Sequence, residues 1–277
     1  MSKTGSAAKV KLNSFDDLFG TEQPQTGTEQ VQEIALSELH EFKGHPFKVL
    51  DDEKMQETME SIREHGVLMP GIARPMKDGG YEIIAGHRRR HACELVGLTT
   101  MPMFIRDYTD DEATIIMVDS NIQREDILPS EKAKAYFMKY EAVKHQGKKG
   151  KGNSLDEVGE TAGESAKTVQ RYIYLAHLSD ALLDMVDKKK IGIVQGVELS
   201  FLTEQQQEWV QVVLEETGVI ISTVQVSRLK EYGKSDELTL PMVRLILTEP
   251  KPIERKVTIK ADKISRYFPA DYSNEQI

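Results

Sequence analysis

Three consecutive arginines, residues 88–90, follow Gly86 at a point where a strand should give way to a helix. Residues 81–85 have the composition of a strand, residues 91–96 that of a helix, and Gly97 marks a helix end. A helix N-terminus exposes unpaired N–H groups and a partial positive charge, so adding cations there is unfavourable unless an anion binds. The pattern therefore predicts a phosphate-bearing ligand. A solvated arginine cluster on a surface helix is the alternative.

A second polar cluster, residues 119–125 (Asp-Ser-Asn-Ile-Gln-Arg-Glu), ends a helix that Thr109 is expected to cap. It combines amide, hydroxyl, carboxylate and guanidinium groups within seven residues. Oxygen atoms of amides and carboxylates suit a hard cation that keeps phosphate oxygens as its other ligands. We expect this cluster to lie beside the arginines; a polar helix end exposed to water is the alternative.

Residues 155–173 have the pattern of a helix-turn-helix. Gly163 supplies a left-handed turn, Ser165 is positioned to cap the second helix, and Val169 and Ile173 would bury it. Such a helix can read a major groove, whereas an ordinary αα-hairpin is the alternative. The predicted DNA-binding residues are Ser165, Ala166, Lys167, Thr168, Gln170 and Arg171 on the helix, with Lys148, Lys149 and Lys151 as contacts to the DNA backbone.

The elements that must position these groups predict two domains. The first is mixed α and β, with strands near 31–36, 71–74, 81–85 and 101–105 and an Asp-Gly-Gly hairpin turn at 78–80. Its first long helix should be capped by Asp51 or Asp52, bury Met55, Met59 and Ile62, and end at Gly66.

The second domain is predicted to be all-helical. Its first helix, from Ser130, should have Ala133, Phe137, Tyr140 and either Val143 or Lys144 on one side. Further helices are predicted at 180–190, 204–216, 222–232 and 240–247. The predicted boundaries are a disordered tail at 1–30, an α+β domain at 31–128, a helical DNA-binding domain at 129–233 with the helix-turn-helix at 154–176, and a C-terminal extension of unassigned role at 234–277, which includes a strand-like run at 256–260.

Composition excludes several classes of protein. The chain has 277 residues, of which 39% are hydrophobic and 29% charged, which suits a soluble protein of about two domains. A net charge of −9 excludes a general polycation, so nucleic acid must be bound by a local basic patch. One cysteine excludes an intrachain disulfide framework. No signal peptide or membrane span is expected, so we predict a cytoplasmic protein with no membrane partner.

Three weaker motifs are set aside. Residues 147–154 nearly match a P-loop, but Asn153 stands where the lysine is required. His87 and His91 have the spacing of metal ligands on one helix face, but no third ligand is evident. Cys93 sits mid-helix among apolar residues, where a buried and unreactive thiol is expected.

The order of these parts resembles the ParB/RepB partition-protein family. Residues 83–92 (Ile-Ile-Ala-Gly-His-Arg-Arg-Arg-His-Ala) resemble its Gly-Glu-Arg-Arg-x-Arg-Ala box, and residues 120–126 resemble its Glu-Asn-x-Gln-Arg box. The helix-turn-helix follows in the expected place. The likeness covers about residues 31–180, and the form with His45-Pro46-Phe47 resembles the proteins of plasmids and mobile elements.

The resemblance implies an α+β, ParB/sulfiredoxin-like domain that binds CTP with Mg²⁺, followed by the helical DNA-binding domain. Gly86, Arg88 and Arg89 would hold the triphosphate, and Asn121 would help to place Mg²⁺. The nucleotide-binding residues implied by the two boxes are Gly86, His87, Arg88, Arg89, Arg90, Asn121, Gln123 and Arg124.

Two departures from the family pattern concern nucleotide chemistry. His87 replaces the glutamate of the first box, and His91 replaces its last arginine. Ser120 replaces the glutamate that the family links to hydrolysis, so weak CTP hydrolysis is left open and no catalytic residue is assigned.

The sequence thus predicts a sequence-specific DNA-binding partition protein, a CTP-gated dimeric clamp on double-stranded DNA in the nucleoid or on a plasmid, with a ParA-type ATPase as a further partner. One alternative is a helix-turn-helix transcription regulator of a mobile element without nucleotide switching. A second is a nuclease of the ParB fold. Sulfiredoxin chemistry is not expected, because Cys93 lies seven positions after Gly86.

Overall fold

The computed structural model describes residues 30–124, 126–146 and 154–249. The chain divides into two compact units, which are described separately. The first comprises Met1–Ile127 and Ala135–Ala166, and the second comprises Leu128–Lys134 and Lys167–Ile277. The predicted tail, the lysines at 148, 149 and 151, and the strand-like run at 256–260 lie outside the described residues.

A five-stranded mixed sheet forms the centre of the first unit, in the order β1-β5-β3-β4-β2. The strands β1 and β5 are antiparallel, β5 and β3 are parallel, β3 and β4 are antiparallel, and β4 and β2 are parallel. Gly79 and Gly80 both have positive φ in the predicted turn between β3 and β4. The strands are β1 Val31–Ala35, β2 Leu39–His40, β3 Gly71–Pro75, β4 Tyr81–Ala85 and β5 Thr100–Ile105, and a 3-10 turn, η1 Leu36–Glu38, follows β1.

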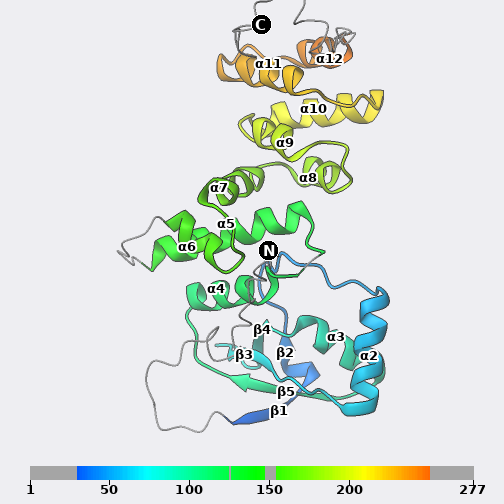
Figure 1. The fold of residues 1–277 in the computed structure, drawn as a ribbon, viewed down its shortest axis with the longest axis vertical. Helices are drawn as coiled ribbons and strands as arrows, with labels where there is room; N and C mark the ends of the chain where they lie inside the picture. The colour runs from blue at the N-terminus through cyan, green and yellow to red at the C-terminus, as the bar shows by residue number, and fades with distance from the viewer. Residues whose placement is uncertain (1–29, 125, 147–153, 250–277) are drawn as a thin grey trace, which may run out of the picture. The chain divides into compact units, whose positions relative to one another are not determined.

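Three helices of this unit begin and end at the signals that the sequence contains. Helix α2 (Glu53–His65) is capped by Asp52, whose side chain accepts from the Met55 N–H at 2.9 Å, and it buries Met55, Met59 and Ile62. Helix α3 (His87–Val96) lies between the left-handed Gly86 and Gly97. Helix α4 (Asp110–Asn121) starts with a capping box formed by Thr109 and Glu112. Helices α2 and α3 pack side by side (Figure 1).

Helix α5 (Pro129–His145) buries only part of the face that was predicted. Ala133 and Val143 are buried as predicted, whereas Phe137 and Tyr140 are half-buried. Lys139 is also buried and was not predicted, because its carboxylate partner, Asp119, comes from another helix. Helix α6 (Ser154–Glu160) follows, and it buries Val158 and Gly159.

The second unit packs its helices around one apolar core. Its members are α7 Ala166–Leu175, α8 Asp180–Asp187, α9 Ile193–Leu199, α10 Glu204–Thr217, α11 Thr223–Lys234 and α12 Leu240–Thr248. Helix α9 was not predicted, and the helix predicted at 180–190 ends at Asp187. Val243, Ile246 and Leu247 of α12 belong to the same core as α8 and α10, so the predicted boundary at 233 separates α12 from helices with which it packs.

The predicted fold class, an α+β domain followed by an all-helical one, is confirmed. Within the described ranges, no helix combines the length and the apolar character that crossing a bilayer requires.

Candidate functional site

Helix α3 begins at a glycine in the left-handed conformation. Gly86 has φ 113° and ψ 12°, a conformation that favours glycine. A Cβ atom there would lie 3.2 Å from the Gly71 Cα and 3.5 Å from an Arg89 guanidinium nitrogen. The first helical bond runs from the Arg90 N–H to the Gly86 carbonyl at 2.9 Å, and the N–H groups that precede Arg90 have no acceptor inside the helix.

A cavity of about 220 Å³ opens at this helix end. It brings together the start of α3 and the end of α4, the two segments that the sequence paired. Among the described residues that line it there is no carboxylate. No signal in the sequence marked Thr58, a residue of α2 that also lines the cavity. The lining residues are Thr58, Ala85, Gly86, His87, Arg88, Arg89, Ser120, Asn121 and Arg124.

The three arginines of the cluster have different partners. Arg88 lines the cavity and donates to the Asp52 carboxylate at 2.5 Å, and this hydrogen bond lowers the pKa of Asp52. Arg89 donates to the backbone carbonyls of Met69 and Pro70, and burial lowers its pKa. Arg90 is outside the cavity lining, because it pairs with Glu94 one turn along α3 at 2.8 Å.

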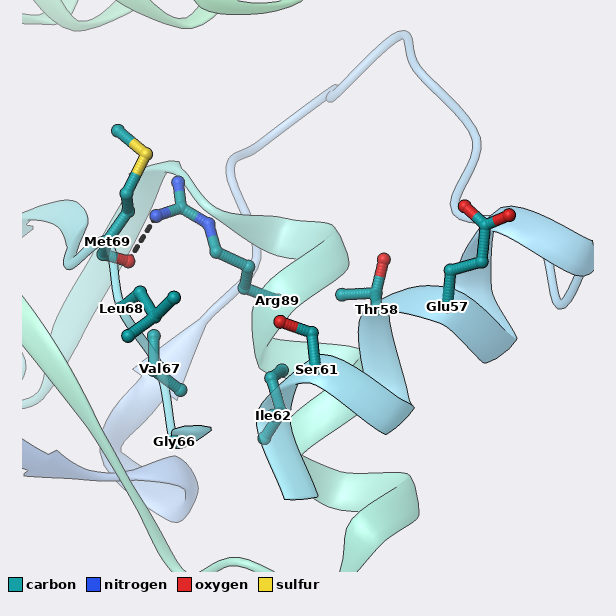
Figure 2. Close-up of a pocket in the computed structure, with 9 residues that line it drawn as sticks. All are labelled: Glu57, Thr58, Ser61, Ile62, Gly66, Val67, Leu68, Met69 and Arg89. Atoms are coloured by element: carbon teal, nitrogen blue, oxygen red, sulfur yellow. Dashed lines mark hydrogen bonds between the residues drawn. The ribbon is translucent and has the colours of Figure 1, made fainter. Parts of the chain in front are cut away.

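A second cavity, of about 360 Å³, lies next to the first and shares Arg89 and Thr58 with it. Figure 2 shows the Arg89 guanidinium reaching the Met69 backbone, with the loop from Gly66 on one side and helix α2 on the other. Leu68 and Met69 are 71% and 58% exposed at this loop. Because these two side chains, with Ile62 and Val67, form part of the lining, the cavity is partly apolar. Its lining residues are Glu57, Thr58, Ser61, Ile62, Gly66, Val67, Leu68, Met69 and Arg89.

His87, the first residue of α3, is a neutral ring stacked on His45. The ring centroids are 3.9 Å apart, and the rings are tilted by 32°. His87 Nε2 accepts from the Phe42 N–H at 3.4 Å, and His45 Nδ1 donates to the Phe47 carbonyl at 2.8 Å. Burial lowers the pKa of His87 to about 3, and the positive charges of Arg124 and Arg90 act in the same direction.

His91 does not join His87 in a ligand set, because its Nε2 bonds to the Asp51 carboxylate at 2.8 Å. The part of the chain that the structure describes holds no group of three or more His, Cys, Asp or Glu side chains suited to a metal ion. Cys93 is fully buried, and burial raises the pKa of its thiol, which is the unreactive state expected from the sequence.

We predict that acid weakens the fold through His87. The unfolded ring titrates near 6.5 and the folded ring near 3, so the unfolded state binds the extra proton between these values. The stability present above pH 6.5 is therefore lost as the pH falls, by about 1.4 kcal/mol per pH unit below pH 6. Urea unfolding between pH 7.5 and 5 should show this slope. His87→Gln should flatten it, and the exposed His65→Gln should leave it unchanged; equal slopes in all three proteins would contradict the prediction.

The polar cluster at the end of α4 divides between two surroundings. Asn121 is buried, and its amide nitrogen donates to the Met117 carbonyl at 2.9 Å and to the Ser120 hydroxyl at 3.3 Å. The amide oxygen is the Asn121 atom with the chemistry to bind a hard cation. Gln123 is not part of the cavity lining, since its side chain donates to the Thr161 carbonyl at 3.2 Å. Arg124 is exposed and lines the cavity.

Helix α7 presents a polar face to solvent. Lys167, Gln170 and Arg171 are exposed, whereas Val169 and Ile173 are buried. Ser165 is exposed just before the helix, and Ala166 and Thr168 are half-buried. Gly163, with φ 65°, makes the left-handed turn that precedes the helix. Four of the six residues that the sequence assigned to DNA in this segment are therefore exposed, namely Ser165, Lys167, Gln170 and Arg171.

Comparisons with known proteins indicate the family to which this chain belongs. The model of the ParB N-terminal domain family matches residues 20–122. A probable chromosome 1-partitioning protein ParB of Deinococcus radiodurans is 32% identical over 212 residues, which cover 76% of this chain and 70% of that protein. A nucleoid occlusion protein of Halalkalibacterium halodurans is 30% identical over 182 residues, and the match spans 66% of this chain and 61% of that relative.

A solved structure of C-terminally truncated ParB from Caulobacter crescentus, complexed with CTP-gamma-S, is 24% identical to this chain. The match covers 68% of this chain and 97% of that one, with a TM-score of 0.32. The Deinococcus relative decides the assignment, and the match to the family model agrees with it: this chain belongs to the ParB family.

Proposed function

We propose that this chain is a nucleotide-gated DNA-binding partition protein, with CTP and Mg²⁺ bound at the α3 cavity and double-stranded DNA bound by α7. The observation that carries the proposal is the first cavity. It joins a glycine-led helix N-terminus to Arg88 and Arg124, with no acidic residue among its described lining. Such an arrangement favours a polyanion.

The triphosphate would bind where helix α3 begins. Backbone N–H groups and the forked guanidinium of Arg88 are donors for phosphate oxygens, and the hydroxyls of Thr58 and Ser120 lie in the same lining. Arg88 is paired with Asp52 in this structure. A phosphate would therefore either displace the Asp52 carboxylate from the Arg88 guanidinium or share the guanidinium with it. Asn121 would hold Mg²⁺, which neutralises phosphate charge when bound.

The nucleoside would lie in the neighbouring, partly apolar cavity. Arg89 and Thr58 line both cavities, so a ligand whose phosphates sit at α3 can extend past them toward Ile62 and Leu68. An apolar face beside a polar phosphate site suits a nucleotide base. That the base is cytosine is what the family resemblance implies.

DNA would be read by the exposed residues of α7, with Lys148, Lys149 and Lys151 contacting phosphates. A ParB-type clamp requires a homodimer, and we include a ParA-type ATPase as a further partner on the family resemblance. Ser120 bears a hydroxyl where the family has a glutamate, and a hydroxyl is a poor general base near neutral pH. We therefore propose slow or no CTP turnover, with nucleotide binding as the switch.

Calorimetry tests the proposal directly. CTP, ATP, GTP and UTP are titrated into the protein with Mg²⁺, each with and without a DNA duplex selected by this protein from a random-sequence pool. Saturable binding of CTP in preference to the other three, weakened by Arg88→Ala, is the expected result. Absence of binding to every nucleotide would overturn the nucleotide part of the proposal.

A helix-turn-helix regulator without a nucleotide switch is the second candidate. The Arg88–Asp52 pair favours it, because this contact accounts for one arginine of the cluster without a ligand. Its signature is sequence-specific DNA binding whose affinity is the same with and without CTP.

A further inference from the structure

Lys139 is a lysine buried in the middle of helix α5, with only 3% of its side chain exposed. Its ammonium donates to the Asp119 carboxylate at 2.5 Å, to the Val158 carbonyl at 3.3 Å and to the Thr161 hydroxyl at 3.3 Å. A lysine has three N–H donors, and each of them has an acceptor here. All four residues belong to the first unit.

Burying an ammonium group costs several kcal/mol unless its charge and its hydrogen bonds are satisfied. A leucine or methionine at this place would fill the same volume without that cost. A buried ion pair of this kind contributes little net stability, so stability alone does not account for it. Its geometry is more informative about its role: the partners of Lys139 come from two segments, each about 20 residues away along the chain, one before it and one after it.

The Asp119 end of this contact adjoins the phosphate cavity. Asp119 lies on helix α4 directly before Ser120 and Asn121, and both of these residues line the cavity. Asp119 is not part of the lining itself. A ligand bound by the Ser120 hydroxyl or the Asn121 amide would act directly on the last turn of α4, which contains Asp119.

The other end adjoins the start of the predicted recognition helix. Val158 and Thr161 belong to the end of α6 and the turn after it, and the chain then passes through Gly163 into α7. Two more contacts hold this segment: Gln123 donates to the Thr161 carbonyl at 3.2 Å, and the Tyr136 hydroxyl donates to Glu164 at 3.1 Å. The segment that leads into α7 is thus bonded to Gln123, two residues after the end of α4, and to Tyr136 of α5.

We propose that Lys139 is a positioning residue that couples the nucleotide cavity to the helix-turn-helix. It rests on the proposed function, and it adds the route by which the two sites influence each other. A displaced α4 terminus pulls Asp119, the ammonium follows the carboxylate, and the bonds to Val158 and Thr161 change. Coupling between two binding sites is reciprocal, so DNA bound at α7 alters nucleotide affinity by the same factor.

The test compares Lys139→Met with Lys144→Met, a lysine on the same helix that is exposed and bonds to Glu141. Fluorescence anisotropy gives the DNA dissociation constant with and without CTP, on a duplex selected by the parent from a random-sequence pool. Coupled sites typically change each other's affinity by about 5- to 150-fold. The ratio of the DNA dissociation constants without and with CTP measures the coupling. We expect the parent and Lys144→Met to show a ratio of that size. In Lys139→Met the ratio should fall to within about twofold of one, while the affinity for CTP is retained.

Removing one partner leaves the Asp119 charge without its cation, so a second variant guards against misfolding. The double variant Lys139→Met with Asp119→Leu removes the pair together and should fold at least as stably as the parent. A ratio near one in this variant supports the coupling. A parent-like ratio in either variant overturns it while leaving the proposed function intact. If CTP leaves the DNA dissociation constant of the parent unchanged although the parent binds DNA, both the nucleotide switch and the coupling are overturned.

Discussion

Arg89→Ala is expected to weaken CTP binding by about 100-fold, which corresponds to about 2.7 kcal/mol. The half-buried side chain lines both cavities and holds the Met69 and Pro70 carbonyls of the loop that forms one wall. Its removal deletes a cation beside the phosphates and also frees that loop. Calorimetry with CTP and Mg²⁺ measures the loss.

Two variants separate these causes. Arg89→Lys keeps the charge but replaces a planar fork by a single ammonium, so an intermediate loss is expected if the shape of the loop matters. Arg63→Ala removes an exposed arginine at the end of α2 that lines neither cavity, and it should bind CTP as the parent does. Parent-like affinity in Arg89→Ala would show that the cavities do not bind the nucleotide in this way.

Arg171→Ala is expected to lower affinity for the selected DNA duplex by about 10- to 100-fold, because a guanidinium that pairs with a base contributes about 1–3 kcal/mol of discrimination. Arg171 is exposed on α7, on the face opposite Val169 and Ile173, so its loss should leave the fold intact. Anisotropy titrations against the selected duplex and a scrambled one, over a range of salt concentrations, measure both affinity and specificity.

The comparison of duplexes decides what Arg171 contacts. A loss confined to the selected duplex indicates a base contact, whereas equal losses on both duplexes and a smaller salt slope indicate a phosphate contact. Lys234→Ala, an exposed cation at the end of α11, is the matched control and should have parent-like affinity. Parent-like binding by Arg171→Ala would remove α7 from the DNA interface.

Local signals in the sequence were enough to predict most helices and strands, and also the two segments that line the first cavity. Helices begin at Asp52 and Thr109 and end at Gly97, as the chemistry of these residues predicts. Capping depends on hydrogen bonds within a few residues, so a short stretch of sequence is enough to predict it. Gly86 and the following arginines marked a helix N-terminus for the same local reason. Periodicity likewise identified the buried and exposed sides of α7, since one helix face is set by spacing alone.

The remaining features depend on contacts between residues that are far apart in the sequence. Arg88 pairs with Asp52 across 36 positions, and Lys139 reaches Asp119 across 20, so neither contact is visible in a window of one helix. The burial of Lys139 on α5 was not predicted for this reason: hydrophobicity disfavours lysine in a core, and only a tertiary carboxylate makes its burial acceptable. By itself, the sequence indicated which residues have the chemistry to bind phosphate and DNA. Only the tertiary structure decided which of them share a cavity, because that depends on how helices distant in the chain pack together.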